Sequence, residues 1–324
     1  MKRLLLSAIS AALLCGAAPI VRAAYSEGFV PPNDLKIPVG SSLARGIQES
    51  QFNTVLDVVQ DIYGPEIAAR GKELVINRLW TDATVNASAQ QSGNRYIINM
   101  YGGLARHTAI TMDGFALVAC HELGHHLGGA PKKSGRWASS EGQSDYYANF
   151  KCLKKIFSEA SSFAFTRTAG GDELAEKNCE QTYSTQEDRV VCVRGAMAGK
   201  SVANLFKVLS NATVEPSFDT PDPKVVPQTN FDNYPPTQCR MDTYLHGSLC
   251  AQPVGSVLSE TDAVPGTCTR SNGFSIGFRP LCWYKPGAAE LLPPVINGPA
   301  FQAPVFSVPG AALSELLEGD PWAR

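Results

Sequence analysis

Apolar residues recur every three or four positions just after residue 50, which is the spacing of one buried helix face. Gly64 and Pro65 follow and predict the end of this helix. The apolar positions are Phe52, Val55, Leu56, Val59, Ile62 and Tyr63. Three runs with the character of strands come next, at 74–80, 85–89 and 95–101.

A second helix is predicted to begin at Thr111 or Asp113, and its apolar residues mark it as a core element. The Gly128-Gly129 pair predicts where it ends. Two further helices are predicted, from Glu141 to about Phe157 and from Val190 to Leu209. Short strands beside longer helices indicate an α+β fold that is mainly helical and has a small sheet.

The N-terminus has the pattern of a signal peptide over residues 1–23. Lys2 and Arg3 precede a short apolar run, and Ala23 ends a cleavage site of small residues. A leucine precedes Cys15, which disfavours a lipoprotein site. The apolar run is too short to span a membrane stably, and no later run is longer. We therefore expect a periplasmic or secreted protein without a stable membrane span.

The composition limits the classes of partner. The chain has 324 residues, 44% of them apolar, which is enough for a sizeable core. Its formal net charge of −2 becomes more negative when the basic leader is removed, which argues against a nucleic-acid partner. Residues 24–46 are rich in Pro, Gly and Ser and predict an extended N-terminal segment. Residues 286–324 form a tail rich in Pro, Ala and Gly.

Nine cysteines include Cys15 of the leader, which leaves eight in the mature chain. An even number in an exported protein indicates a disulfide framework in an oxidising compartment. The eight are Cys120, Cys152, Cys179, Cys192, Cys239, Cys250, Cys268 and Cys282. Short spacings favour the local pairs Cys239–Cys250 and Cys268–Cys282, which would tie residues 239–285 into one region.

Residues 121–125 read HELGH and contain the pattern HExxH, the signature of zinc peptidases. Residues four apart lie one above the other on a helix, so His121 and His125 can bind one metal ion. Glu122 follows the first ligand and points beside the metal, where it can take a proton from water.

A catalytic zinc site has a third protein ligand and one open position for water. Pro131 stands where a histidine would complete the longer pattern HExxHxxGxxH, so that pattern is excluded. Glu141 and Asp145 are four apart, and Ser140 with Gln143 makes a capping box that starts a helix there. Glu141 is the predicted third ligand. Asp145 is predicted to accept the free ring N–H of a ligand histidine.

Together, HELGHHLGG at 121–129 and EGQSDYYA at 141–148 resemble the HtpX-like and CAAX-prenyl-endopeptidase group of zinc metallopeptidases, a gluzincin family. The resemblance extends over residues 47–242. Residues 85–89 are similar to an Asn-Ala segment upstream of the family's active-site helix. Residues 234–240 resemble a late His-Pro…Arg element that approaches the zinc.

This resemblance implies a zincin-like, gluzincin-type catalytic domain at 47–238, with the disulfide-rich region 239–285 packed on it. Tyr234 stands where the family has histidine, and a phenol can donate to a developing oxyanion. Arg240 is expected to contact the substrate or Glu141. The family's membrane-spanning helices are absent, so prenylated membrane proteins are not the expected substrate.

In metallopeptidases of this type, the last strand before the active-site helix is an exposed edge that binds an extended peptide through main-chain hydrogen bonds. The run at 95–101 fits this role and fits equally an ordinary strand of the sheet. Cys120 is one position from His121 and faces away from the metal, so a buried or disulfide-linked role is expected. His126 is expected to be a surface or packing residue for the same reason. His107 and His246 are either oxyanion donors or ordinary polar residues.

These residues predict a zinc-dependent endopeptidase acting on a protein or peptide substrate. Zn²⁺ is expected on His121, His125 and Glu141, with Glu122 as general base. Two alternatives stay open. One is an envelope chaperone-like or scaffolding protein with a latent or structural zinc site, and the other is a disulfide-stapled binding module without zinc. The intact Glu122 favours catalysis, because a structural site does not need that carboxylate.

Overall fold

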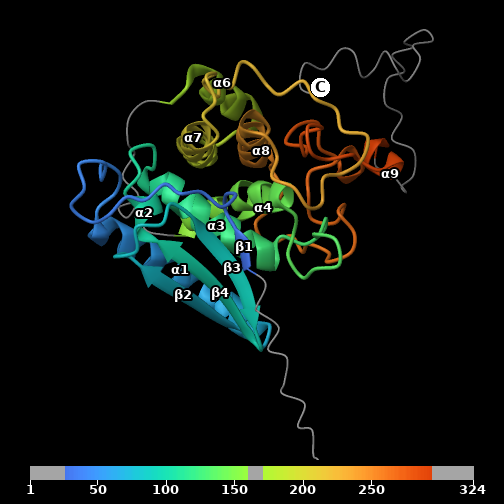
Figure 1. Ribbon diagram of the computed structural model, residues 1–324. Helices are drawn as coiled ribbons and strands as arrows, with labels where there is room; N and C mark the ends of the chain where they lie inside the picture. Colours follow the sequence, from blue (N-terminus) through green and yellow to red (C-terminus); the bar gives the residue numbers. More distant parts are fainter. Residues whose placement is uncertain (1–25, 160–170, 294–324) are drawn as a thin grey trace, which may run out of the picture.

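The computed structural model describes residues 26–159 and 171–293, so the expected signal peptide and the end of the tail lie outside the described residues. The elements in chain order are β1 (Ser26–Gly28), α1 (Glu49–Ala69), β2 (Glu73–Leu79), β3 (Ala87–Ser92), β4 (Arg95–Tyr101), α2 (Gly102–Ala105), α3 (Met112–Leu127), α4 (Glu141–Tyr147), the π-helical segment η1 (Ala148–Leu153), α5 (Lys154–Glu159), α6 (Glu173–Thr182), α7 (Gln186–Leu209), α8 (Thr237–Leu249), the 3-10 helix η2 (Arg270–Asn272) and α9 (Ala288–Leu291). The fold is α+β and mainly helical, with the small sheet on one side of the helices (Figure 1).

The sheet has the strand order β1-β3-β4-β2. Strand β4 pairs antiparallel with β3 and parallel with β2, so it lies inside the sheet. Its predicted role as an exposed, peptide-binding edge is therefore wrong, and it is an ordinary internal strand. The edge next to β3 is formed by β1, which comes from the extended N-terminal segment and pairs antiparallel with β3.

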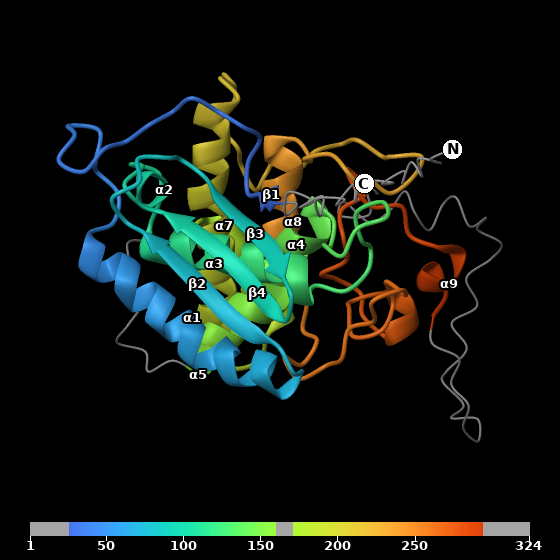
Figure 2. The ribbon, with the colours of Figure 1, turned by 60° about the horizontal axis from the view of Figure 1, so that its bottom comes forward.

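One face of the sheet is apolar and packs on α1 and α3 (Figure 2). Ala87 pairs with Met100 and Ala89 with Ile98, and all four side chains are fully buried. The residues between them point to the opposite face, because side chains alternate along a strand. There a polar ladder crosses three strands: Asn77 donates to Asn99, which donates to Ser88.

Helix α1 continues past Gly64 and Pro65 to Ala69, so the predicted end at that pair is wrong. Ile67 lies beyond that pair, is fully buried and extends the apolar stripe of the helix by another turn. Burial of one large apolar side chain is worth about 1.5–3 kcal/mol, which offsets a large part of the cost of about 3 kcal/mol for a proline inside a helix.

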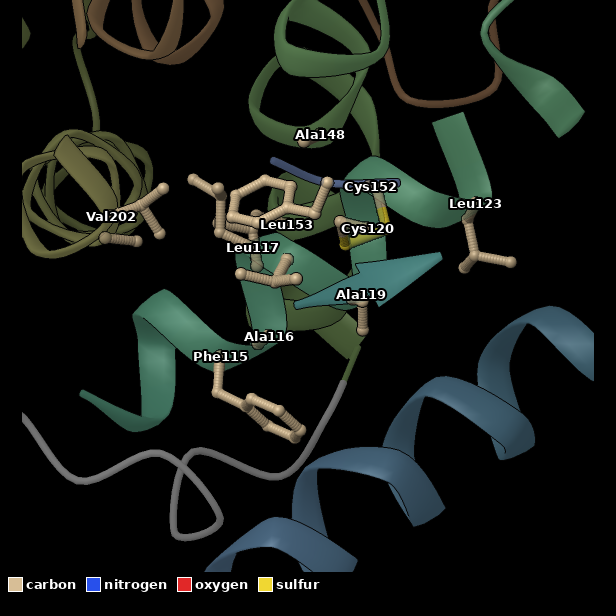
Figure 3. Close-up of a cluster of buried hydrophobic side chains, with 14 of the residues drawn as sticks. Phe115, Ala116, Leu117, Ala119, Cys120, Leu123, Ala148, Cys152, Leu153 and Val202 are labelled. Atoms are coloured by element: carbon tan, nitrogen blue, oxygen red, sulfur yellow. A yellow bond between two sulfur atoms is a disulfide. The ribbon is translucent and has the colours of Figure 1, made fainter. Parts of the chain in front are cut away.

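Helix α3 is the centre of the core. Thr111 caps it by accepting a hydrogen bond from the Gly114 N–H at 3.0 Å, which confirms one of the two predicted starts. Every residue from Gly114 to Leu127 is buried. Figure 3 shows apolar side chains of α3 packed with Leu153 of η1 and Val202 of α7. The helix ends before Gly129, whose φ of +69° is a conformation that glycine adopts without strain.

The helix predicted from Glu141 to about Phe157 is present as three consecutive segments, α4, η1 and α5. Ser140 caps α4 through its hydroxyl, which accepts from the Gln143 N–H. Helix α7 begins at Gln186, four residues before its predicted start. Gly199 allows α7 to pack closely on α8, since a Cβ at Gly199 would lie 2.5 Å from the side chain of Tyr244.

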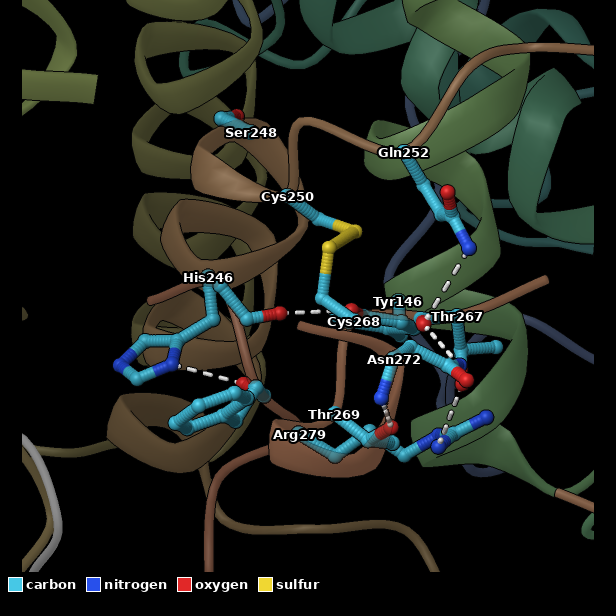
Figure 4. The surroundings of a disulfide bond; sticks show 12 residues. Tyr146, His246, Ser248, Cys250, Gln252, Thr267, Cys268, Thr269, Asn272 and Arg279 are labelled. Atoms are coloured by element: carbon cyan, nitrogen blue, oxygen red, sulfur yellow. Dashed lines mark hydrogen bonds between the residues drawn. A yellow bond between two sulfur atoms is a disulfide. The ribbon is translucent and has the colours of Figure 1, made fainter. Parts of the chain in front are cut away.

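Four disulfides join Cys120 to Cys152, Cys179 to Cys192, Cys239 to Cys282, and Cys250 to Cys268. The predicted pairs Cys239–Cys250 and Cys268–Cys282 are wrong. Cys239 lies in the first turn of α8 and Cys250 just after its last, so the rise of the helix separates them by about 16 Å. A disulfide needs α-carbons within about 7 Å. Figure 4 shows Cys268 reaching Cys250 at the end of α8 instead.

Helix α9 lies in the described part of the tail. Within the described residues, no helix is both long enough and apolar enough to cross a membrane. The disulfides fit a periplasmic or extracellular protein.

Candidate metal centre

Two helices bring the three predicted ligands together. His121 and His125 lie one turn apart on α3, and Glu141 is the first residue of α4. One Glu141 oxygen lies 3.3 Å from Nε2 of His121, and the other lies 3.8 Å from Nε2 of His125. One ligand atom from each of the three residues fits within a mutual distance of 4.8 Å. All three side chains are fully buried.

The Nε2 atoms of His121 and His125 have no hydrogen-bond partner among the described residues. A buried polar atom without a partner is costly unless another group satisfies it. Two imidazole nitrogens and a carboxylate that converge in the interior form a donor set for a cation. The group formed by His121, His125 and Glu141 could therefore hold a metal ion.

The other ring nitrogens orient the two imidazoles. Nδ1 of His121 lies 2.7 Å from Oδ1 of Asp145, as predicted. Nδ1 of His125 lies 2.9 Å from the Ser139 carbonyl oxygen and 3.0 Å from the Ser144 hydroxyl. A proton on each Nδ1 satisfies these oxygens and leaves the Nε2 lone pairs for a metal.

The electrostatics of the two histidines differ. Burial acts to lower the pKa of His121, but the adjacent Asp145 and Glu141 carboxylates together outweigh burial, and the pKa rises to about 9. The ring therefore carries a proton on both nitrogens near pH 7, and a metal that binds Nε2 must displace the proton there. Burial lowers the pKa of His125 to about 3, so this ring is neutral near pH 7. Burial acts to raise the pKa of Glu141, but the two imidazoles and the Lys133 ammonium hold it below its usual range.

Asp145 connects α4 to α8. Its carboxylate accepts two hydrogen bonds from Arg240, from Nε at 2.7 Å and Nη2 at 2.8 Å, in a bidentate ion pair. It accepts a further hydrogen bond from the Tyr244 hydroxyl at 2.5 Å. Burial acts to raise the pKa of Asp145, but Arg240 and His121 lower it, so the carboxylate is ionised. The aspartate that orients His121 is thus itself held in place.

Glu122 is fully buried and neighbours His121 on α3. Lys133, in the loop between α3 and α4, is also buried, and its Nζ lies 2.8 Å from Oε1 of Glu141. Sequence reasoning did not find Lys133, because a lysine in a loop carries no motif. Tyr244 was missed because it is far from Asp145 in the chain, and Ser144 because the acidic motif assigns roles only to Glu141 and Asp145.

Tyr234 and Arg240, the predicted groups for substrate, both contact the N-terminal segment. The Tyr234 hydroxyl donates to the Gly28 carbonyl oxygen at 2.8 Å. Nη1 of Arg240 donates to the Phe29 carbonyl oxygen at 2.9 Å. The guanidinium of Arg240 is paired with Asp145, whereas the sequence predicts a contact with substrate or Glu141.

The remaining histidines have other roles. The His126 ring is stacked between the rings of Tyr96 and Trp137, with centroid distances of 4.5 and 4.7 Å. Of the two roles expected for His126, surface or packing, the structure shows packing. Nδ1 of His107 accepts from the Ala109 N–H, and Nδ1 of His246 lies 2.7 Å from the Phe278 carbonyl oxygen. Neither joins the group of His121, His125 and Glu141.

Protein-family models, curated proteins and solved structures give no match to this chain.

Proposed function

We propose that this protein is a zinc-dependent endopeptidase of the bacterial envelope or exterior, resembling the gluzincins. One observation carries the proposal. His121, His125 and Glu141 converge in the interior, with the Glu122 carboxylate buried next to His121 on the same helix. A structural metal site gains nothing from that extra carboxylate, whereas hydrolysis needs a base beside the metal.

The donor set favours zinc. Two imidazoles and one carboxylate, with room for water as a fourth ligand, are typical of catalytic zinc in peptidases. Neighbouring ligands of a tetrahedral zinc with bonds of about 2.1 Å lie about 3.4 Å apart. The 3.3 Å from His121 to Glu141 agrees with this spacing, and the 3.8 Å from His125 is somewhat wider. Zinc in this site would polarise a peptide carbonyl and lower the pKa of water to about 7.

The chain's own groups divide the remaining work. Glu122 takes a proton from the attacking water and delivers it to the leaving amine. His121, His125 and Glu141 would hold the metal, and Asp145 keeps the His121 ring in the orientation that presents Nε2. Arg240 and Tyr244 keep Asp145 ionised and in position. The four disulfides support an oxidising compartment.

Metal content tests the site directly. Elemental analysis of the mature, oxidised protein is expected to give about one zinc per chain, and Glu141→Ala is expected to lose most of it. Glu180→Ala is the matched control, because that side chain is 70% exposed on α6. A folded wild-type protein that holds no zinc would refute the proposal and favour a binding module.

Glu122→Gln tests the chemistry separately from the metal. The amide cannot act as general base, so we expect full zinc content with a loss of peptide hydrolysis of at least about 100-fold. A Glu122→Gln protein that still cuts peptide at the wild-type rate would exclude the mechanism.

A further inference from the structure

The N-terminal segment lies along the open side of β3 as an added strand. Ser26, Glu27 and Gly28 pair antiparallel with β3. The Phe29 N–H donates to the Ala87 carbonyl oxygen at 2.9 Å. The side chain of Asn86 bonds both main-chain groups of Val30, at 3.2 and 3.1 Å. Main-chain pairing of this kind is how a sheet edge binds an extended peptide of varied sequence.

The carbonyl groups of this segment are held by side chains next to the metal ligands. Tyr234 donates to the Gly28 carbonyl oxygen, and Arg240 to that of Phe29. Arg240 is bonded through Asp145 to His121, and the Lys133 ammonium connects the Tyr234 ring to Glu141. The two side chains that the sequence predicts for substrate carbonyls thus already hold carbonyls of the chain itself.

The Phe29 side chain covers His121. Its ring meets the His121 ring edge-on, with centroids 4.9 Å apart, and lies 5.2 Å from the Phe206 ring. The Arg240 guanidinium lies 4.8 Å from its centroid. Phe29 has no exposed surface, and neither has His121. An aromatic side chain of the segment therefore fills a pocket whose wall includes a metal ligand.

The candidate metal centre is closed to solvent in this arrangement. Glu122, His125 and Glu141 have no exposed surface either, so a substrate cannot reach them in this arrangement. Figures 1 and 2 both show β1 beside α4 and α8, the helices that carry Glu141, Asp145 and Arg240. No cysteine lies between Cys15 and Cys120, so the segment can leave without breaking a disulfide.

We propose that residues 26–30 are an internal pseudosubstrate, which occupies the position where an extended peptide with a large apolar or aromatic side chain binds along β3. The inference rests on the proposed peptidase function. Because the segment belongs to the same chain, its effective concentration beside β3 is on the order of millimolar, and a free peptide competes poorly. The protein is latent until the segment is displaced.

The pseudosubstrate proposal can be tested by cutting the chain between the segment and α1, which leaves the residues of the metal centre unchanged. A protease recognition sequence is inserted after Gly40, an exposed position where an added Cβ would meet no heavy atom, and is cut after folding. In the Glu122→Gln background, the probe is a fluorescein-labelled peptide, Ser-Glu-Gly-Phe-Val-Pro-Pro, and the readout is anisotropy. Cutting and removal of the released segment are expected to tighten probe binding at least about tenfold relative to the uncut protein. The same peptide with Asp in place of Phe is expected not to bind.

A point variant gives a second route. Phe29→Asp places a charge in the apolar pocket and is expected to expel the segment, raising hydrolysis of a quenched phenylalanine-containing peptide at least about tenfold. Val39→Asp is the control, because Val39 belongs to the same segment but is 55% exposed.

The zinc content of the cut and uncut proteins distinguishes a failure of the pseudosubstrate proposal from a failure of the proposed peptidase function. If the cut protein is folded and retains its zinc but binds the probe no better than the uncut protein, the pseudosubstrate is refuted while the metal site stands. If neither form holds zinc, the proposed function fails, and the inference fails with it.

Discussion

At the scale of single residues, Asp145 shows how much one buried carboxylate can organise. It accepts hydrogen bonds from His121 of α3 and from Arg240 and Tyr244 of α8. Its contact with His121 was predictable, because the motif spacing places Asp145 one helical turn after Glu141. Its contacts with α8 were not, because residues 95 and 99 positions later in the chain carry no local signal of proximity.

Asp242, also on α8, is expected to make the free energy of unfolding depend on pH. Burial raises the pKa of Asp242 from its usual 3.8 to about 7, despite hydrogen bonds from the Asp222 N–H and the Gln238 amide. The folded protein therefore holds a proton that the unfolded chain releases near pH 4. This stabilisation is complete below pH 4 and is lost as the pH rises through 7, at about 1.4 kcal/mol per pH unit.

We expect the free energy of unfolding of the wild type to fall by about 2–4 kcal/mol between pH 4 and 7, relative to Asp242→Asn. The asparagine does not titrate, so the variant removes this contribution. Urea unfolding of both proteins across this range gives the difference. Parallel curves would show that Asp242 does not titrate as inferred.

At the scale of elements, the metal centre depends on how closely α3 approaches α4. Gly124 faces Ser144 at the contact, and a Cβ at Gly124 would lie 2.9 Å from both the α-carbon and the carbonyl oxygen of Ser144. Those are backbone atoms, which cannot rotate away. A larger residue must therefore push α4, which carries Glu141, away from the histidines of α3.

Gly124→Ala is expected to destabilise the protein by about 1–3 kcal/mol and to weaken zinc binding at least about tenfold. Gly255→Ala is the matched control, since nothing lies within 4 Å of a Cβ there. Titration against a zinc chelator measures both affinities. Equal zinc affinity in the two variants would mean that the helix contact does not set the ligand geometry.

At the scale of the whole molecule, the disulfides hold together parts that local sequence does not connect. Cys120–Cys152 encloses the stretch that contains all three predicted metal ligands. Cys239–Cys282 connects the start of α8 to the segment that carries Trp283. The Trp283 ring packs on Gly142, next to the third ligand, and its indole N–H donates to the Thr243 hydroxyl. The C-terminal region thus supports the metal centre from behind α4.

The double variant Cys120→Ala/Cys152→Ala is expected to lose about 3–4 kcal/mol of stability and to release zinc at a lower urea concentration than the wild type. Cys179→Ala/Cys192→Ala is the control. This double variant lacks the disulfide between α6 and α7, which contributes a similar free energy of unfolding and lies away from the metal ligands. The control protein is expected to keep its zinc until global unfolding. Zinc release and unfolding followed in one urea titration distinguish the two variants. Identical zinc release would contradict the role assigned to Cys120–Cys152.

The sequence by itself determined what depends on local periodicity and spacing. The placement of His121 and His125 on one helix face and of Glu141 and Asp145 on another, the capped starts of α3 and α4, and the disulfide-forming cysteines all follow from residues a few positions apart or from composition. Helical geometry is the same wherever such residues occur, so no knowledge of the rest of the fold is needed.

Only the tertiary structure decided which distant segments meet. Local signals favoured a helix end at Pro65 and the pair Cys239–Cys250, but burial of Ile67 and the rise of α8 overrode them. The internal position of β4 and the placement of residues 26–30 beside His121 likewise came from the fold. Strand order, disulfide pairing and closure of the site depend on contacts far apart in the chain, and their energies come from burial that no short stretch of sequence can report.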